Sequence, residues 1–271
     1  PTGVELSGAL AEIARHTLKG DFRSIHPPDA RIILIDAAPR ILPTYPEDLS
    51  DKAERSLFNL GVQARPGVMV TCIDGAGVTL QTVSGNEHLA SRTVLWTAGV
   101  SISEFGRQIA KRTGAETTRS GHIKVAADLS IPNHPDIFVI GDLAYVAGHD
   151  GKPLPGVAQV AMQGGAYVAK TIVKRIEGKR GLKPFHYVDK GSLAVIGRAA
   201  AVADLFGLHL SGFIAWIVWV FIHLLYIVEF QSRILVLIEW GFLYLTFNRG
   251  ARLITGSAAS RAEPLSRPPN A

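Results

Sequence analysis

Residues 1–36 read PTGVELSGALAEIARHTLKGDFRSIHPPDARIILID, and this stretch decides the fold class. Apolar residues recur at helical spacing from Val4 to His16, directly after Gly3. Arg31–Asp36 is a continuous apolar run that ends in an acid, which is typical of a buried parallel strand. A glycine at a helix start and an acid at the end of the next strand match the second half of a dinucleotide fingerprint. A plain helix followed by a strand-ending acid fits the pattern equally well.

The next residues extend this unit. Three prolines between residues 39 and 46 predict a loop, and Glu47–Leu60 returns to a helical pattern that Gly61 ends. Residues 62–100 contain the β-rich pieces VMVTCI, VTLQTV and TVLWTAGV, separated by turns with glycine. The order of helix, strand, helix and meander indicates a dinucleotide-binding domain, which we assign to residues 1–120.

A second segment covers residues 121–204. It contains DIFVIGD at residues 136–142, interpreted as a buried strand with Gly141 and Asp142 at its carboxyl end, where open α/β sheets bind ligands. A long helix is predicted over Val157–Glu177. These features predict a further part of a nucleotide-binding α/β fold.

The C-terminal part has a different composition. In residues 205–256, two apolar runs cover Phe213–Val228 and Ile234–Phe247. Each is shorter than the roughly 20 residues of a simple membrane span, and Glu239 would cost roughly 2.5 to 3.5 kcal/mol at a bilayer centre. We therefore predict helices that lie on a membrane surface without crossing it. A hydrophobic hairpin buried in a dimer interface is the alternative.

Aromatic and basic residues near these runs suit a lipid surface. The aromatic ones, expected at the headgroup boundary, are Trp216, Trp219, Tyr226, Trp240 and Tyr244. The flanking basic ones, expected to meet anionic lipid, are Arg233, Arg249 and Arg252. The tail, residues 257–271, is rich in Ser, Ala, Arg and Pro and is predicted to be disordered.

Composition excludes several classes of protein. The single cysteine, Cys72, excludes an intrachain disulfide and a CxxC redox pair, so any electron transfer must use a bound cofactor. The nine histidines show no zinc-binding spacing, so we predict no metal site. The net charge of +5 comes from scattered basic residues, which argues against nucleic-acid binding and favours contact with anionic lipid.

Six segments occur in an order that is specific to one family. They are PTGVELSGALAE, IDAAPRILP, LWTAGV, IFVIGDLA, GVAQVAMQGG and DKGSLAVIGRAAAVAD. The chain resembles the type II NADH:quinone oxidoreductases, members of the two-dinucleotide-fold flavoprotein superfamily. The resemblance implies an α/β fold: a Rossmann-like NADH-binding domain, the C-terminal part of an FAD-binding domain, and amphipathic membrane-associating helices.

The resemblance also assigns residues to NADH. Gly3 would be the last glycine of the NADH fingerprint, Glu5 would lie near the nicotinamide, and Asp36 would hold the adenosine ribose. Ala98 and Gly99 would form the turn where the nicotinamide approaches the flavin. An acid at position 36 favours NADH over NADPH, whose 2′-phosphate it repels. Arg40 weakens that preference a little, unless it is an ordinary loop arginine.

The remaining site residues are assigned to FAD and quinone. By resemblance, Gly141 and Asp142 would contact FAD, and Ala158–Gln163 matches the AQxxxQ element. Gln159 and Gln163 lie four residues apart on one helix face, so both amides can reach one planar ligand such as a quinone. Lys190 matches a position near the flavin, although a capping or surface role fits it as well.

The activity implied is hydride transfer from NADH to FAD and transfer of two electrons to quinone, without proton pumping. The implied location is peripheral, on the cytoplasmic face of the inner (plasma) membrane. The sequence does not decide whether the protein forms a homodimer. Because the chain begins at a helix start without methionine, we interpret it as truncated, lacking the N-terminal half of its FAD site. The alternatives are a non-catalytic, membrane-associated nucleotide-binding fragment and another pyridine-nucleotide flavoprotein reductase.

Overall fold

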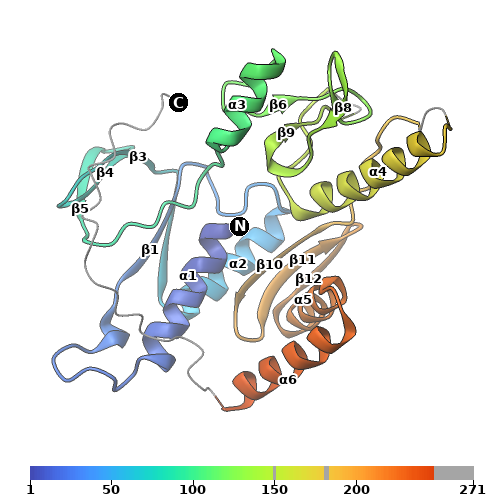
Figure 1. Ribbon diagram of the computed structural model, residues 1–271. Helices are drawn as coiled ribbons and strands as arrows, with labels where there is room; N and C mark the ends of the chain where they lie inside the picture. The colour runs from blue at the N-terminus through green and yellow to red at the C-terminus, as the bar shows by residue number, and fades with distance from the viewer. Residues whose placement is uncertain (149–150, 180–182, 247–271) are drawn as a thin grey trace. The chain divides into compact units, whose positions relative to one another are not determined.

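The computed structural model describes residues 1–148, 151–179 and 183–246, and these form two compact units (Figure 1). The first unit contains residues 1–97 and the chain from residue 191 onward. The second unit contains residues 98–190. The chain therefore leaves the first unit and later returns to it, and each unit has its own core.

The first unit contains most of the elements. They are α1 (Thr2–Glu12), a π-helical turn (Ile13–Thr17), a 3₁₀ turn (Pro27–Asp29), β1 (Ile32–Asp36), α2 (Glu47–Asn59), β2 (Val62–Pro66), β3 (Met69–Ile73), β4 (Gly77–Thr82), β5 (Gly85–Ala90), β10 (Ser192–Gly197), β11 (Ala200–Leu205), β12 (Leu208–Ser211), α5 (Gly212–Tyr226) and α6 (Phe230–Thr246). The predicted first helix, first strand and second helix are confirmed. Strand β1 pairs in parallel with β2, so that Asp36 lies opposite Pro66.

Helices α1 and α2 form the middle layer of the first unit. They contact the β1–β2 pair and also the antiparallel sheet β10–β11–β12, and α5 packs against that same sheet. Leu49, Ala53 and Leu57 recur every four residues along α2, and none of them has any exposed surface. This helical stripe of apolar side chains supplies the centre of the core, and Gly61, with a φ of +77°, allows the chain to turn after the helix.

Two glycines of α1 let the helix approach its neighbours closely. A Cβ atom on Gly3 would lie 2.9 Å from Thr97 Oγ1 and 3.0 Å from Leu34 Cδ1. A Cβ atom on Gly8 would lie 1.6 Å from the carbonyl oxygen of Ile196 in β10, a separation that no side chain can adopt. Helix α1 therefore packs closely against β1 at Gly3 and against β10 at Gly8. The close approach at Gly3 was expected from the glycine at the helix start.

The meander is confirmed in two of its three predicted pieces. Strands β3, β4 and β5 form one antiparallel sheet, in which β5 (Gly85–Ala90) was not predicted. The third piece, TVLWTAGV at residues 93–100, was predicted to be β-rich, and this was wrong because the segment has no strand pairing. Val94, Leu95 and Trp96 are exposed there. Among the described strands none pairs with this segment, and an apolar run becomes a strand only when a neighbour satisfies its backbone.

The second unit is smaller and has short strands. It contains α3 (Glu104–Thr113), β6 (Ile123–Lys124), β7 (Ser130–Ile131), β8 (His134–Phe138), a 3₁₀ turn (Gly141–Leu143), β9 (Ala144–Tyr145) and α4 (Ala158–Ile176). The long helix predicted over Val157–Glu177 is confirmed as α4. The core of the second unit contains Ala110, Ile123, Ile131 and Val139.

The segment DIFVIGD needs a correction. The predicted buried strand ends at Phe138, pairs antiparallel with β7, and has exposed residues at Asp136 and Ile137. A two-stranded hairpin covers only part of its own surface, which is why this apolar run is not buried along its length. Val139, just after the strand, is the buried residue.

Helices α5 and α6 confirm that both C-terminal apolar runs are helical. Within the described ranges, no helix combines the length and the apolar character that a membrane crossing requires. The predicted disordered tail, residues 257–271, and the predicted lipid contacts Arg249 and Arg252 lie outside the described residues.

Candidate functional site

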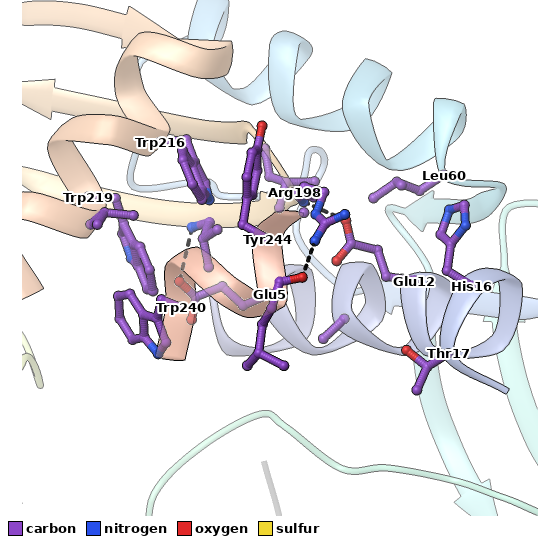
Figure 2. Close-up of a pocket in the computed structure, with 16 residues that line it drawn as sticks. Glu5, Glu12, His16, Thr17, Leu60, Arg198, Trp216, Trp219, Trp240 and Tyr244 are labelled. Atoms are coloured by element: carbon purple, nitrogen blue, oxygen red, sulfur yellow. Dashed lines mark hydrogen bonds between the residues drawn. The ribbon is translucent and has the colours of Figure 1, made fainter. Parts of the chain in front are cut away.

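A pocket of about 550 Å³ opens in the first unit between α1, β10, α5 and α6 (Figure 2). Its lining falls into a polar set and an aromatic set. The polar set is Glu5, Glu12, His16 and Arg198, and the aromatic set is Trp216, Trp219, Trp240 and Tyr244. The pocket therefore offers carboxylates and a guanidinium next to flat apolar rings, which suits a planar molecule with polar groups at its edge.

The two carboxylates come from one face of α1. Glu5 and Glu12 are seven residues apart, which is two helical turns. The backbone N–H of Val195 donates to Glu5 Oε1 at 3.1 Å, and the backbone N–H of Arg198 donates to Glu12 Oε1. Both side chains are therefore oriented by backbone donors of the β10–β11 hairpin. Glu5, predicted to lie near a nicotinamide, lines this pocket.

The aromatic wall joins α5 to α6. Trp216 packs on Tyr244 with ring centroids 5.0 Å apart, and Trp219 stacks on Trp240 at 5.6 Å. These four rings, predicted to lie at a lipid headgroup boundary, contact each other between the two helices, and that position stays a prediction. Of the five aromatic residues predicted there, Tyr226 is the one left largely exposed, at 48%.

Arg198 closes the pocket at the end of α6. Its guanidinium lies over the Tyr244 ring, with 4.7 Å from Cζ to the ring centroid, and donates to the carbonyl oxygen of Leu243 at 2.7 Å. Arg198 thus fixes the C-terminal turn of α6 against the hairpin.

Asp36 lies at the carboxyl end of β1, where parallel strands present ligand-binding groups. Its Oδ1 accepts a hydrogen bond of 2.9 Å from the backbone N–H of Ala38, which fixes the direction of the carboxylate. The side chain is half-buried. This geometry suits a carboxylate that accepts hydrogen bonds from a ribose diol.

Arg40 is directed toward its own loop. Its guanidinium donates to three backbone carbonyl oxygens, those of Leu42 at 3.3 Å, Pro43 at 3.0 Å and Tyr45 at 2.7 Å. Leu42 has a φ of +49°, a conformation that costs free energy outside glycine and that these bonds help to hold. The Arg40 guanidinium, which we considered as a partner for a 2′-phosphate of NADPH, therefore binds carbonyl oxygens of its own loop.

Tyr45 lies beneath this loop in the core, with 5% of its surface exposed. Burial, helped by the carboxylates of Glu5 and Asp204, raises the pKa of its hydroxyl well above the ordinary tyrosine range. The phenol therefore stays neutral at physiological pH.

In the second unit, two predicted glycines have backbone conformations that favour glycine. Gly99 has a φ of +74° and Gly141 a φ of +65°, and a Cβ atom on Gly141 would lie 3.4 Å from Ala161 Cβ in α4. Ala98, next to Gly99, is exposed, and so is Asp142, the second residue of the 3₁₀ turn. The Gly141–Asp142 turn therefore lies close to α4, and its contact with FAD stays a prediction.

The AQxxxQ element opens α4. Ala158 is the first residue of the helix, and both glutamine amides lie on one side of it and bind the chain at residues 188–190. Lys190 is exposed, and its backbone N–H donates to Gln159 Oε1 at 3.3 Å. As the four-residue spacing predicted, both amides lie on one side of the helix and reach the same segment. In this structure they bind the backbone of residues 188–190.

Two protein-family models match this chain. Residues 1–165 match the family model described as pyridine nucleotide-disulphide oxidoreductase, and residues 190–247 match the NDH2 C-terminal domain. The chain belongs to the pyridine nucleotide-disulphide oxidoreductase family. Its resemblance to the type II NADH:quinone oxidoreductases is confirmed by the relatives described next.

Two relatives come from Mycobacterium tuberculosis. The type II NADH:quinone oxidoreductase Ndh is 44% identical over 262 residues, which are 96% of this chain and 56% of the relative. The type II NADH:quinone oxidoreductase NdhA is 41% identical, over 94% of this chain and 54% of the relative. The chain thus spans about half the length of the curated relatives it matches.

A solved structure shows the same fold. The structure of NDH2 from Plasmodium falciparum in complex with NADH aligns with a TM-score of 0.78 and 19% identity, over 90% of this chain and 63% of that one. The α/β fold expected of this pyridine nucleotide-disulphide oxidoreductase is confirmed by that likeness.

The predicted site residues of this family member fall into the two units. The first unit holds Gly3, Glu5 and Asp36, and the second holds Ala98, Gly99, Gly141, Asp142, Ala158, Gln159, Gln163 and Lys190. Glu12 and Arg198 were missed. The helical period from Glu5 could have indicated Glu12, whereas Arg198 reaches α6 only through the fold.

Proposed function

We propose that the full-length protein is an NADH:quinone oxidoreductase that transfers a hydride from NADH to FAD and two electrons on to a quinone, without pumping protons. The observation that carries this proposal is the 44% identity, over 96% of the chain, to a relative with that named activity. FAD, when bound, supplies the hydride acceptor and the two-electron donor. The residues of this chain bind and orient the reactants.

Each predicted residue has a proposed task. Gly3 lets α1 approach β1 beside the NADH pyrophosphate, and Asp36 accepts hydrogen bonds from the adenosine ribose. Ala98, Gly99 and Glu5 lie at the nicotinamide. The FAD contacts are Gly141, Asp142 and Lys190, Ala158 is a further cofactor-binding residue, and the quinone end is assigned to Gln159 and Gln163. We keep residues 1–120 as the NADH-binding domain and residues 121–204 as the C-terminal part of the FAD-binding domain.

The direct test uses purified full-length protein with FAD. Under anaerobic conditions, NADH should bleach the flavin absorbance, and a soluble quinone should restore it. Flavin that NADH does not bleach would contradict the NADH site, and reduced flavin that no quinone reoxidises would contradict the quinone site.

Asp36→Ala should reduce the preference for NADH over NADPH. The lost carboxylate no longer accepts hydrogen bonds from the ribose hydroxyls and no longer repels a 2′-phosphate, so kcat/KM for NADH should fall about 10- to 100-fold. Steady-state kinetics with both donors measures this. Asp51→Ala, an exposed acid on α2, is the matched control and should leave the ratio unchanged. An equal kcat/KM for the two donors in the unmodified protein would show that Asp36 does not select the nucleotide.

We also propose that α5 and α6 hold the protein on lipid at the cytoplasmic face of the inner membrane. Large apolar side chains are exposed on one side of each helix. On α5 they are Ile214, Ile217, Phe221 and Leu225, and on α6 they are Leu235, Ile238, Phe242 and Leu245. Exposed apolar surface of this extent is unfavourable in water, and the net charge of +5 favours an anionic surface.

A further inference from the structure

Arg175, in the last turn of α4, contacts the hairpin of β7 and β8 at three points. Its Nη2 donates to Asp128 Oδ2 at 3.2 Å, just before β7, and its Nη1 donates to the carbonyl oxygen of Pro135 at 2.5 Å, in β8. The guanidinium also lies over the Phe138 ring at the end of β8, with 4.9 Å from Cζ to the ring centroid. One planar cation therefore binds both sides of the β7–β8 hairpin to the helix, which a lysine ammonium could not do in the same geometry.

The β7–β8 hairpin contains backbone conformations that need support. Leu129 and Asn133 both have a φ of +66°, which costs free energy outside glycine and persists only where contacts hold it. Asp128 fixes the turn before β7, because its Oδ1 accepts from the Ser130 N–H at 3.1 Å and from the Ser130 hydroxyl at 2.6 Å. Partial burial raises the pKa of this carboxyl, but the Ser130 bonds and the Arg175 charge outweigh it and hold the pKa below its usual range. The carboxylate is therefore charged, as a partner for Arg175 must be.

The chain that leaves β8 runs along α4 toward the start of the helix. A Cβ atom on Gly164 would lie 3.6 Å from Ile140 Cγ2, and one on Gly141 would lie 3.4 Å from Ala161 Cβ. These separations are ordinary van der Waals contact, so the chain lies directly on the helix. Val139, just before these residues, is 4% exposed and belongs to the core of the second unit. Residues 139–141 are thus packed between helix and core, and a shift of β8 along α4 moves Gly141 as well.

We propose that Arg175 is a positioning residue for FAD. By binding the β7–β8 hairpin at one end of α4, it sets where the Gly141–Asp142 turn lies near the other end. Arg175 and Ala161 are 14 residues apart on the helix, which is about 21 Å at 1.5 Å per residue. Arg175 therefore acts on the turn through β8. The proposal rests on the proposed function, since that function assigns FAD to Gly141 and Asp142.

The test measures FAD release from the full-length holoenzyme by flavin fluorescence. Arg175→Met keeps a long side chain without the guanidinium and should raise the Kd for FAD about 10-fold, the equivalent of one lost hydrogen bond to a charged group. Arg175→Lys keeps the charge without the planar fork and should recover part of this affinity. Lys170→Met removes a cation from an exposed position on the same helix, so it is the matched control and should leave the Kd unchanged.

Asp128→Asn is the milder variant. It keeps an oxygen that can accept from Ser130 but removes the charge that binds Arg175, so the Kd for FAD should rise in the same direction. Combined with Arg175→Met it should raise the Kd little further, because the two residues act as a pair. Fully additive effects of the two changes would overturn the proposal that this pair positions the turn.

Thermal unfolding separates positioning from general stability. Arg175→Met should lower the Tm of the FAD-bound protein more than that of the FAD-free protein, because weaker binding stabilises the native state less. An equal fall in both Tm values with an unchanged Kd would overturn the proposal and leave Arg175 a purely structural residue. If Arg175→Met does not fold, Asp128→Asn decides the same comparison.

A second measurement distinguishes failure of this proposal from failure of the proposed function. The backbone N–H of Val139 donates to the carbonyl oxygen of Leu129 at 3.0 Å, and it should exchange its hydrogen faster in Arg175→Met. If the unmodified full-length protein binds no FAD, the proposed function fails and the FAD role of Arg175 fails with it. Faster exchange would then still show that Arg175 holds the β7–β8 hairpin, and unchanged exchange would overturn that anchoring too.

Discussion

Replacing Leu235, Ile238 and Leu245 with glutamate is expected to move the full-length protein from the membrane pellet to the soluble fraction. These side chains lie on one face of α6 and are 67%, 64% and 79% exposed. Inserting each into the lipid interface contributes at least about 1.5 kcal/mol, so losing all three weakens membrane binding about 1,000-fold. The added carboxylates are also repelled by anionic lipid.

Sedimentation with anionic vesicles measures this partition. Phe58→Glu is the matched control, because Phe58 is an equally exposed apolar residue, at 77%, on α2 of the same unit. Continued pelleting of the triple variant would show that α6 does not bind lipid. Truncation at residue 205 is a poorer test, since Ala215 of α5 packs against Ala201 and Ala203, and removing it would open the core.

Gly8→Ala should destabilise the first unit by about 3 kcal/mol or more, at the upper end of what overpacking a core costs. The added methyl would lie 1.6 Å from the Ile196 carbonyl oxygen, a backbone atom that can move only if β10 moves. The shift should separate α1 from the hairpin and weaken the bonds of Glu5 and Glu12 to it. A fall of several degrees in Tm is expected.

Thermal unfolding followed by circular dichroism measures the effect. Gly241→Ala is the control, because Gly241 lies inside α6 with open space around its Cβ position. Alanine is the better helix former, so this change should be neutral or stabilising by up to about 1 kcal/mol. An unchanged Tm for Gly8→Ala would mean that α1 does not pack on β10 as closely as described.

Periodicity in the sequence predicted most of the helices and the first strand. The stripe Leu49, Ala53 and Leu57 identifies α2, and the long apolar runs identify α5 and α6, because helical burial depends on local spacing. Residues 93–100 were mispredicted because strand formation depends on a partner distant in sequence. The exposed side of DIFVIGD depends in the same way on which strand lies beside it.

The site was less predictable than the fold. The place of Asp36 at a strand end and the alignment of Gln159 and Gln163 on one helix face were predicted because both follow from local spacing, whereas their roles stay predictions. The stacking of Trp219 on Trp240 could not be found, because it depends on how α5 and α6 pack against each other. The hydrogen bonds of Arg40 to carbonyl oxygens of its own loop could not be predicted either, because they depend on the positive φ of Leu42.

Arg198 gives the first unit a mechanical linkage. Its backbone N–H is held by Glu12 of α1, and its guanidinium holds the carbonyl of Leu243 in α6. One residue therefore connects the helix that begins at Gly3 with the helix whose apolar face is exposed. A force that pulls α6 away from the hairpin must break one of these two bonds or move α1 as well, so displacement of α6 is transmitted to α1.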